Sequence, residues 1–105
     1  MPKYLVQGYY TDQGLKGLLE EGGSKRRVMV EKLAEEMGGK LEVFYYAFGS
    51  DDFVIILDLP SNIDMAATAI VAQASGMVKS RVTVLMDPEE VDQAVQRKVD
   101  FRPPS

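Results

Sequence analysis

The chain has 105 residues, of which 46% are hydrophobic and 27% are charged, and these are ordinary values for one globular domain with its own core. Its net charge of −4 disfavours nucleic acid as a partner, because neutralising phosphates requires a basic surface. It contains no cysteine and no histidine, which excludes disulfides, thiolate nucleophiles and imidazole ligands, so we expect no haem, flavin or transition-metal cofactor.

The first segment of the chain predicts a strand followed by helix. Residues Tyr4 to Tyr10 are rich in aromatic and branched side chains, which favour a strand. Thr11 to Gly14 reads as a turn, and the leucines of Leu15 to Glu21 recur at helical spacing. Gly22-Gly23 interrupts that helix.

Ser24 to Met37 is the clearest helix of the sequence. Ser24 is a suitable N-cap, and the apolar residues of this segment recur at helical spacing. The basic cluster Lys25-Arg26-Arg27 reads as the solvated first turn. Whether this helix continues the preceding one or stands apart from it is left open. The apolar stripe consists of Val30, Leu33, Ala34 and Met37.

Two strands, Leu41 to Phe48 and Phe53 to Leu59, are separated by the polar segment Gly49 to Asp52, which is typical of a hairpin. In each strand, large apolar side chains point to both faces, because they occur at odd-numbered and at even-numbered positions. A strand that is apolar on both sides must be covered on both faces. Helices are expected to cover one face, and the other needs a different partner.

A second long helix is predicted after Pro60, with Ser61 as N-cap and Asp64 three residues on. Gly76 ends it. We expect its alanine-rich stripe to pack closely against the sheet. The expected stripe consists of Ile63, Ala66, Ala67, Ile70 and Ala74.

Val78 to Met86 alternates as a fourth strand, and Asp87-Pro88 opens a last helix with an N-cap followed by proline. Residues 1–98 are therefore expected to form one domain, and 99–105 a C-terminal tail. No segment resembles a signal peptide, and every apolar run falls short of the roughly 18 residues that span a membrane. We expect a cytoplasmic protein without a membrane partner.

The element order is typical of an α+β, ferredoxin-like βαββαβ fold with an extra C-terminal helix. It predicts an antiparallel four-stranded sheet in the order 4-1-3-2, with the helices on one side. Because the other side is also apolar, we expect a homodimer, or a higher oligomer built from dimers, joined through that face.

Several segments resemble the GYD family, whose members are of the dimeric α/β-barrel type. The most specific are Thr11-Asp12-Gln13-Gly14 at the exit of the first strand, and Gly49 and Asp52 in the hairpin. Asp51 stands where the family has a tyrosine. The resemblance implies this fold and the dimer, and it implies no established activity. Further matches are Ala34 to Lys40, Phe44-Tyr45-Tyr46, Pro60 and Gly76-Met77-Val78.

Two groups of polar residues are candidates for a ligand site. Asp58 lies in an otherwise apolar strand, so it needs an ion-pair partner such as Lys79 or Arg81, or water at a strand end. A polar anchor in a pocket is the alternative. Strand tyrosines usually belong to a core or an interface. In a dimeric barrel, however, a cavity between helices and sheet is an expected place for a ligand. The candidate ligand-binding residues are Tyr10, Tyr45, Tyr46, Asp58 and Arg81.

No residue set carries a catalytic signature. The adjacent carboxylates Asp51 and Asp52 point to opposite faces of a strand and make a poor acid–base pair. The favoured hypothesis is a non-enzymatic homo-oligomer that binds a small molecule. The alternatives are a cofactor-independent monooxygenase-like enzyme, by analogy of fold alone, and a ligand-sensing regulatory domain.

Overall fold

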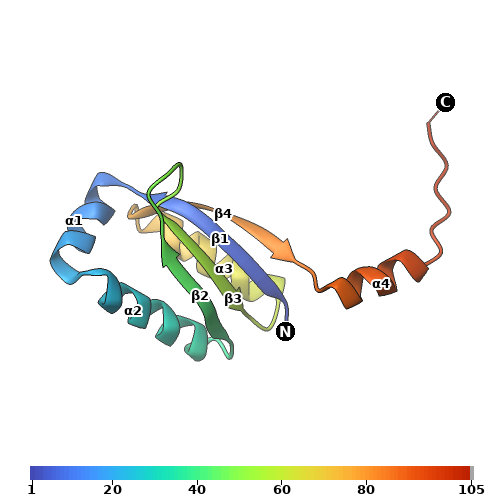
Figure 1. Cartoon of the computed structure of the whole chain (residues 1–105), viewed down its shortest axis with the longest axis horizontal. Coiled ribbons are helices and arrows are strands. Elements are labelled where there is room, and N and C mark those ends of the chain that lie inside the picture. Colours follow the sequence, from blue (N-terminus) through green and yellow to red (C-terminus); the bar gives the residue numbers. More distant parts are fainter. Residues whose placement is uncertain (105) are drawn as a thin grey trace.

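The computed structural model describes residues 1–104 and confirms the predicted order of strands and helices (Figure 1). The four strands form one antiparallel sheet in the order β2-β3-β1-β4. This α+β arrangement is the ferredoxin-like fold, and the strand order is the one expected from the sequence. The elements are β1 (Lys3–Tyr10), α1 (Asp12–Glu21), α2 (Gly23–Glu36), β2 (Lys40–Tyr46), β3 (Phe53–Asp58), α3 (Asn62–Ala74), β4 (Val78–Leu85) and α4 (Pro88–Gln96).

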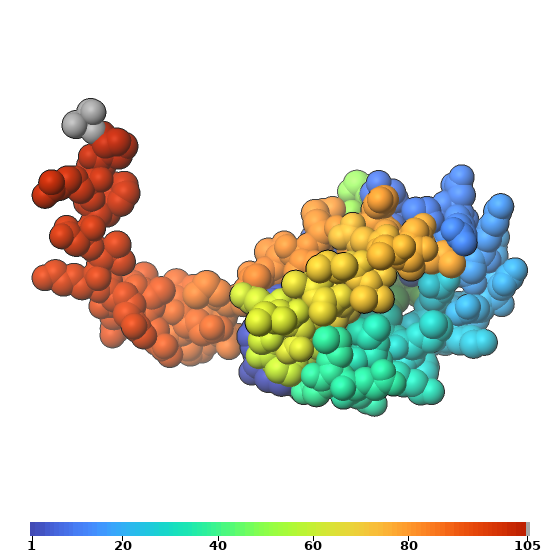
Figure 2. All heavy atoms as spheres, turned by 180° about the vertical axis from the view of Figure 1, so that it is seen from behind, coloured from blue at the N-terminus to red at the C-terminus, as the bar shows by residue number. Residues whose placement is uncertain are grey.

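The core lies between one face of the sheet and the helices α2 and α3. Figure 2 shows these two helices, in teal and yellow, next to each other on that side of the molecule. Alternate residues of the central strands point into this layer because side chains of a strand alternate between faces. The buried core consists of Tyr4, Val6, Tyr10, Ala34, Phe53, Ile55, Leu57, Leu59 and Met65.

The opposite side of the sheet, which we call the open face, is formed by the alternate residues of each strand that point away from the core. The register pairs Lys3 with Asp58 and Leu5 with Ile56 on this side. Tyr45 on β2 is 70% exposed there. Within residues 1–104, no helix packs on this face (Figure 1). The open face consists of Lys3, Leu5, Gln7, Tyr9, Val43, Tyr45, Val54, Ile56, Asp58, Lys79, Arg81, Thr83 and Leu85.

The segment 11–14 was expected to be a turn, but it forms the cap and the first helical turn of α1. The Thr11 hydroxyl accepts from the Gly14 N–H at 3.2 Å and donates to the Gly76 carbonyl oxygen at 2.7 Å. Gly14 packs so tightly that a Cβ added there would lie 2.1 Å from the Met77 carbonyl oxygen. The segment thus ties the exit of β1 to the entry of β4.

The helices α1 and α2 are separate. Gly22 lies between them with φ of 83°, a left-handed conformation that glycine adopts without strain. The helical hydrogen bonds end at this residue, whose N–H donates to the Leu18 carbonyl oxygen at 2.8 Å. The question left open by the sequence is therefore answered in favour of two helices.

The predicted buried stripe of α3 is wrong. Met65 is buried and Thr68, Ala69 and Ala72 face the sheet, whereas Ile63 is 81% exposed and Ile70 is 68% exposed. The error has a physical cause. Apolar residues occur on every side of α3, so two stripes fit the helical period equally well.

The last helix, α4, projects away from the rest of the molecule (Figure 1). None of its residues is buried, so it covers neither face of the sheet. Its start is as predicted, with Asp87 preceding Pro88 and the Glu90 carboxylate accepting from the Asp87 N–H at 2.9 Å. The apolar edge formed by Val91 and Val95 is exposed.

Candidate functional site

A cavity of about 170 Å³ lies between the sheet and the helices α2 and α3. Every strand contributes to its wall, and the bulk of the lining is aliphatic or aromatic. The lining residues are Val6, Tyr10, Arg26, Val30, Leu33, Phe44, Phe53, Ile55, Leu57, Met65, Thr68, Ala69, Ala72, Val78 and Ser80.

Arg26 is the one charged residue among those lining residues. Its Nε atom is buried, and no acceptor within the described part of the chain bonds to it. The nearest carboxylate oxygen, Oε2 of Glu21, lies 3.7 Å from this nitrogen, which is beyond hydrogen-bond range. An ion pair is present, yet the N–H is left without a hydrogen bond.

Two neighbouring residues contact the guanidinium of Arg26. It lies over the ring of Tyr10, 5.7 Å from the ring centroid, which is cation–π distance. It also lies against Gly17, where an added Cβ would be only 2.4 Å from Nη2. The lack of a side chain at Gly17 therefore makes room for the arginine.

Tyr10 lines the cavity beside Arg26, and Tyr46 lies next to Tyr10 in an adjoining groove. Burial, followed by the neighbouring Tyr46, raises the pKa of Tyr10 well above its usual value. Tyr46 donates its hydroxyl to the Gly23 carbonyl oxygen at 3.1 Å. The Tyr10 ring also packs on Phe53, with the ring centroids 5.3 Å apart. Tyr10 is consequently a neutral, fixed wall of the site at physiological pH.

The structure divides the five candidate residues between the two faces of the sheet. Tyr10 lines the cavity, and Tyr46 joins it in an adjoining groove. Tyr45, Asp58 and Arg81 lie on the open face instead. The candidate residues therefore lie in two separate regions, and Arg81 does not share the cavity with Tyr10.

Arg26 was missed because the cluster of residues 25–27 was taken for a solvated turn. Its side chain is 18% exposed, whereas that of Arg27 is 54% exposed. A signal was nonetheless present, since Arg26 precedes Val30 by four residues and so continues the apolar stripe of α2 toward its N-terminus.

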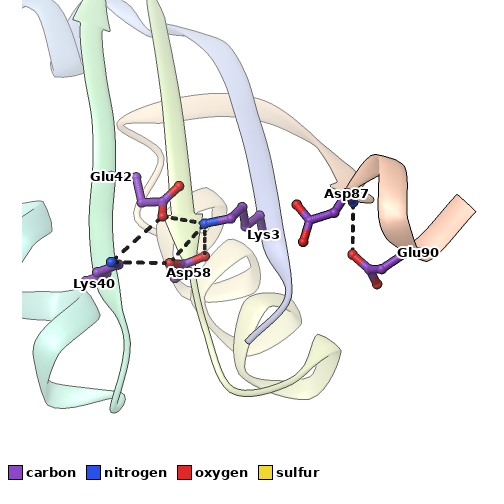
Figure 3. Close-up of polar contacts among 6 residues, drawn as sticks. All are labelled: Lys3, Lys40, Glu42, Asp58, Asp87 and Glu90. Carbon is purple, nitrogen blue, oxygen red and sulfur yellow. Dashed lines mark hydrogen bonds and ion pairs between the residues drawn. The ribbon is translucent and has the colours of Figure 1, made fainter.

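On the open face, Asp58 is paired with Lys3 and not with Lys79 or Arg81 as expected (Figure 3). The Lys3 Nζ atom lies 3.1 Å from Oδ1 of Asp58 and also bonds to Glu42. Lys40 completes the group, 3.9 Å from Oδ2 of Asp58. Lys79 and Arg81 are on β4, and β1 lies between β4 and the strand that carries Asp58, β3.

Charge balance within this group sets the ionisation of Asp58. Burial acts to raise the pKa of Asp58, but the hydrogen bonds of Lys3 and the charges of Lys3 and Lys40 together lower it below its usual value. The bonds to Glu42 and Asp58 likewise raise the pKa of Lys3. The group is an ion-pair network that joins three strands.

Asp51, at the position of the family's tyrosine, forms a bidentate ion pair with Arg81. The two nitrogen–oxygen distances are 3.0 and 2.9 Å. These hydrogen bonds lower the pKa of Asp51. The contact connects the hairpin loop to β4 and so gives this position a structural role in the present chain.

Asp52 fixes the base of the same hairpin. Its Oδ2 atom accepts a hydrogen bond from the Tyr10 N–H at 2.9 Å, and its own N–H donates to the Gly8 carbonyl oxygen at 2.7 Å. Together with Thr11 and Gly14, Asp52 therefore holds the end of β1 in place. The family positions found at this end of the sheet support the site without lining the cavity.

Across residues 1–104, no three of the His, Cys, Asp and Glu side chains lie close enough together to hold a metal ion. Within the same part of the chain, no helix combines the length and apolar character needed to cross a bilayer.

The ferredoxin-like sheet, its two-sided apolar strands and the Thr11–Gly14 and hairpin segments define the class of this protein. A family model described as GYD domain matches residues 4–95, and the chain belongs to that family. A search of the curated proteins and a search of the solved structures each found no match.

Proposed function

We propose that this protein is a non-enzymatic homodimer that binds a small molecule in the cavity between α2, α3 and the sheet. The observation that carries the proposal is the place of Arg26 in the wall of an otherwise apolar cavity, together with its buried Nε–H, which has no acceptor among residues 1–104. Cavities with a few convergent polar groups are the usual sites of small ligands. Buried polar groups are normally paired, and a ligand would supply the missing partner.

The character of the cavity wall favours binding over catalysis. Its titratable side chains are Arg26 and Tyr10. Arginine remains protonated in proteins, and the pKa of Tyr10 is raised further from neutrality. Neither group changes its charge near pH 7, which is what a general acid or base must do efficiently.

The open face supports the homodimer. Its centre is apolar, with Leu5, Val54 and Ile56 on adjacent strands. The ion pairs Lys3–Asp58 and Arg81–Asp51 flank this apolar centre. Four strands about 4.8 Å apart and about eight residues long, at roughly 3.4 Å per residue, give a face of roughly 500 Å². Two such faces would bury roughly 1,000 Å², the lower limit for a specific interface.

The helix α4 supplies the additional apolar surface that such a dimer needs. Val91 is 45% exposed and Val95 is 75% exposed, and they lie four residues apart on one side of the helix. A capped helix with an uncovered apolar edge gains stability when that edge is buried. The helix α4 follows β4 after two residues and lies beyond that end of the sheet (Figure 1). We propose that a second copy covers this helix together with the open face.

Light scattering at micromolar concentration tests the dimer. The chain mass is 11.7 kDa, so the expected mass is twice that value, and a mass of one chain would contradict the proposal. Val54→Lys places a charge at the centre of the open face and should dissociate the dimer. Leu19→Lys is the matched control, since Leu19 is 85% exposed on α1, away from this face.

Thermal unfolding in the presence of toluene tests the cavity. A ligand that binds only the folded state raises the melting temperature in proportion to its occupancy. We expect a saturable rise for the unmodified protein and none for Ala69→Leu, whose added methylenes fill the cavity. An equal rise in both proteins would show that toluene binds elsewhere.

A further inference from the structure

We infer that the ligand of this cavity is a small monocarboxylic acid with a one-ring or short aliphatic body, whose carboxylate binds Arg26. This inference rests on the proposed function, since it names the chemical class of the molecule that the cavity takes. It is carried by three features: the orphaned N–H of Arg26, the fixed position of its guanidinium, and the size and apolarity of the space beside it.

The polar end of the cavity selects for an anionic acceptor. The Nε–H of Arg26 is buried and has no acceptor among residues 1–104. A guanidinium presents its donors as a planar fork that matches the two oxygens of a carboxylate. A neutral acceptor would satisfy the N–H but would forgo this charge-assisted bond. The other lining residues with a polar side-chain atom are Tyr10, Thr68 and Ser80, and these are uncharged at neutral pH.

Glu21 is the internal competitor for this arginine. Its Oε2 atom lies 3.7 Å from the Arg26 Nε, and its side chain is 33% exposed. At this distance it offsets the charge of the guanidinium without bonding to Nε. A ligand carboxylate within hydrogen-bond distance of Nε would therefore form a hydrogen bond that Glu21 does not form. The negative charge of Glu21 would at the same time repel that carboxylate and weaken its binding.

The guanidinium is preorganised for such a ligand. The Tyr10 ring and the backbone of Gly17 both contact it and limit its movement. A donor that is already held in its binding geometry loses little side-chain freedom when the ligand arrives. A substituted Gly17 would collide with this side chain and displace it.

The apolar end of the cavity sets the size of the ligand. Its volume of about 170 Å³ is close to that of an apolar protein cavity of about 150 Å³ that accommodates benzene. The wall also contains apolar side chains such as Val6, Ile55 and Met65. One ring or a short branched chain fills this space, whereas a fatty acid or a nucleotide is too large.

Calorimetric titration with benzoate and toluene tests the inference. The unmodified protein should bind benzoate at least about tenfold more tightly than toluene. Arg26→Met keeps much of the side-chain volume and removes the donors, so benzoate binding should weaken by at least about tenfold while toluene binding is retained. Arg27→Met, on the exposed side of the same helical turn, should bind both probes as the unmodified protein does.

Glu21→Gln gives a second, opposite readout. Removing the competing carboxylate should tighten benzoate binding severalfold and leave toluene binding unchanged. Toluene binding also shows that each variant keeps its folded cavity. If toluene binds but benzoate does not, an acid is ruled out as the ligand. If benzoate binds but Arg26→Met and Glu21→Gln leave its binding unaffected, Arg26 is ruled out as the partner of the carboxylate. In both cases the inference fails while the small-molecule site remains. If neither probe binds, the proposed function fails together with the inference.

Discussion

The carboxylate of Asp52 accepts a hydrogen bond from the backbone N–H of Tyr10 at 2.9 Å. This contact links the β2–β3 hairpin to the end of β1, where Tyr10 turns its ring toward Arg26. A family position in the hairpin is thus connected to the cavity through the backbone of the residue that forms the cavity wall.

Asp52→Ala should lower the free energy of unfolding by about 1–3 kcal/mol, because it leaves the Tyr10 N–H without its charged acceptor. Urea denaturation measures this loss. Ser50→Ala in the same loop is the control, since Ser50 is exposed and should change stability by no more than about 0.5 kcal/mol. Equal effects of the two changes would refute the role of Asp52.

Gly14→Ala should destabilise the fold by about 2 kcal/mol or more, because the new Cβ would lie 2.1 Å from the Met77 carbonyl oxygen. The backbone of α1 and the start of β4 would have to move apart. Gly49→Ala is the matched control, as a Cβ there meets nothing within 4 Å. Melting temperatures that fall equally in both variants would contradict the close packing seen at Gly14.

The ion-pair network on the open face predicts a loss of stability in acid. Since the folded-state pKa of Asp58 is lowered, its contribution is fully present above the unfolded-state pKa of about 3.9 and is lost as the pH falls through the folded value. Urea midpoints measured from pH 6 down to pH 2 should therefore fall more steeply in the unmodified protein than in Asp58→Asn.

Lys3→Met gives the complementary test of the same network. The raised pKa of Lys3 means that its contribution is present below the unfolded-state pKa of about 10.4 and is lost as the pH rises through the folded value. Lys3→Met should lower the urea midpoint at pH 7, whereas Lys16→Met on the exposed side of α1 should not. An unchanged midpoint for Lys3→Met would show that Asp58 does not depend on this partner.

The sequence predicted the fold well because its local signals agree with one another. The glycines at 22–23 and 38–39, proline at 60 and the caps at 61 and 87 all mark element ends. The stripe of α3 was misjudged because Ile63 and Ile70 are as apolar as the side that packs. Periodicity alone cannot choose between two apolar sides of a helix.

The candidate site could be predicted only in part. Tyr10 was identified and does line the cavity. Tyr45 and Tyr46 are adjacent on β2 and point to opposite faces, and nothing in their chemistry indicates which one faces the helices. A register irregularity in β2 between Leu41 and Val43 also obscures that alternation. The burial of Arg26 depends on the packing of α1 against α2, and its position four residues before Val30 is the local sign of that burial in the sequence.

The most direct test of the account is to locate a small molecule in the cavity by nuclear Overhauser effects between toluene and the methyl groups of the protein. Val6, Ile55 and Met65 line the cavity, whereas Val54 and Ile56 are their close neighbours on the open face. We predict saturable cross-peaks from toluene to the first three residues and none to the last two. Cross-peaks confined to Val54 and Ile56, or no saturable binding, would contradict the proposed site.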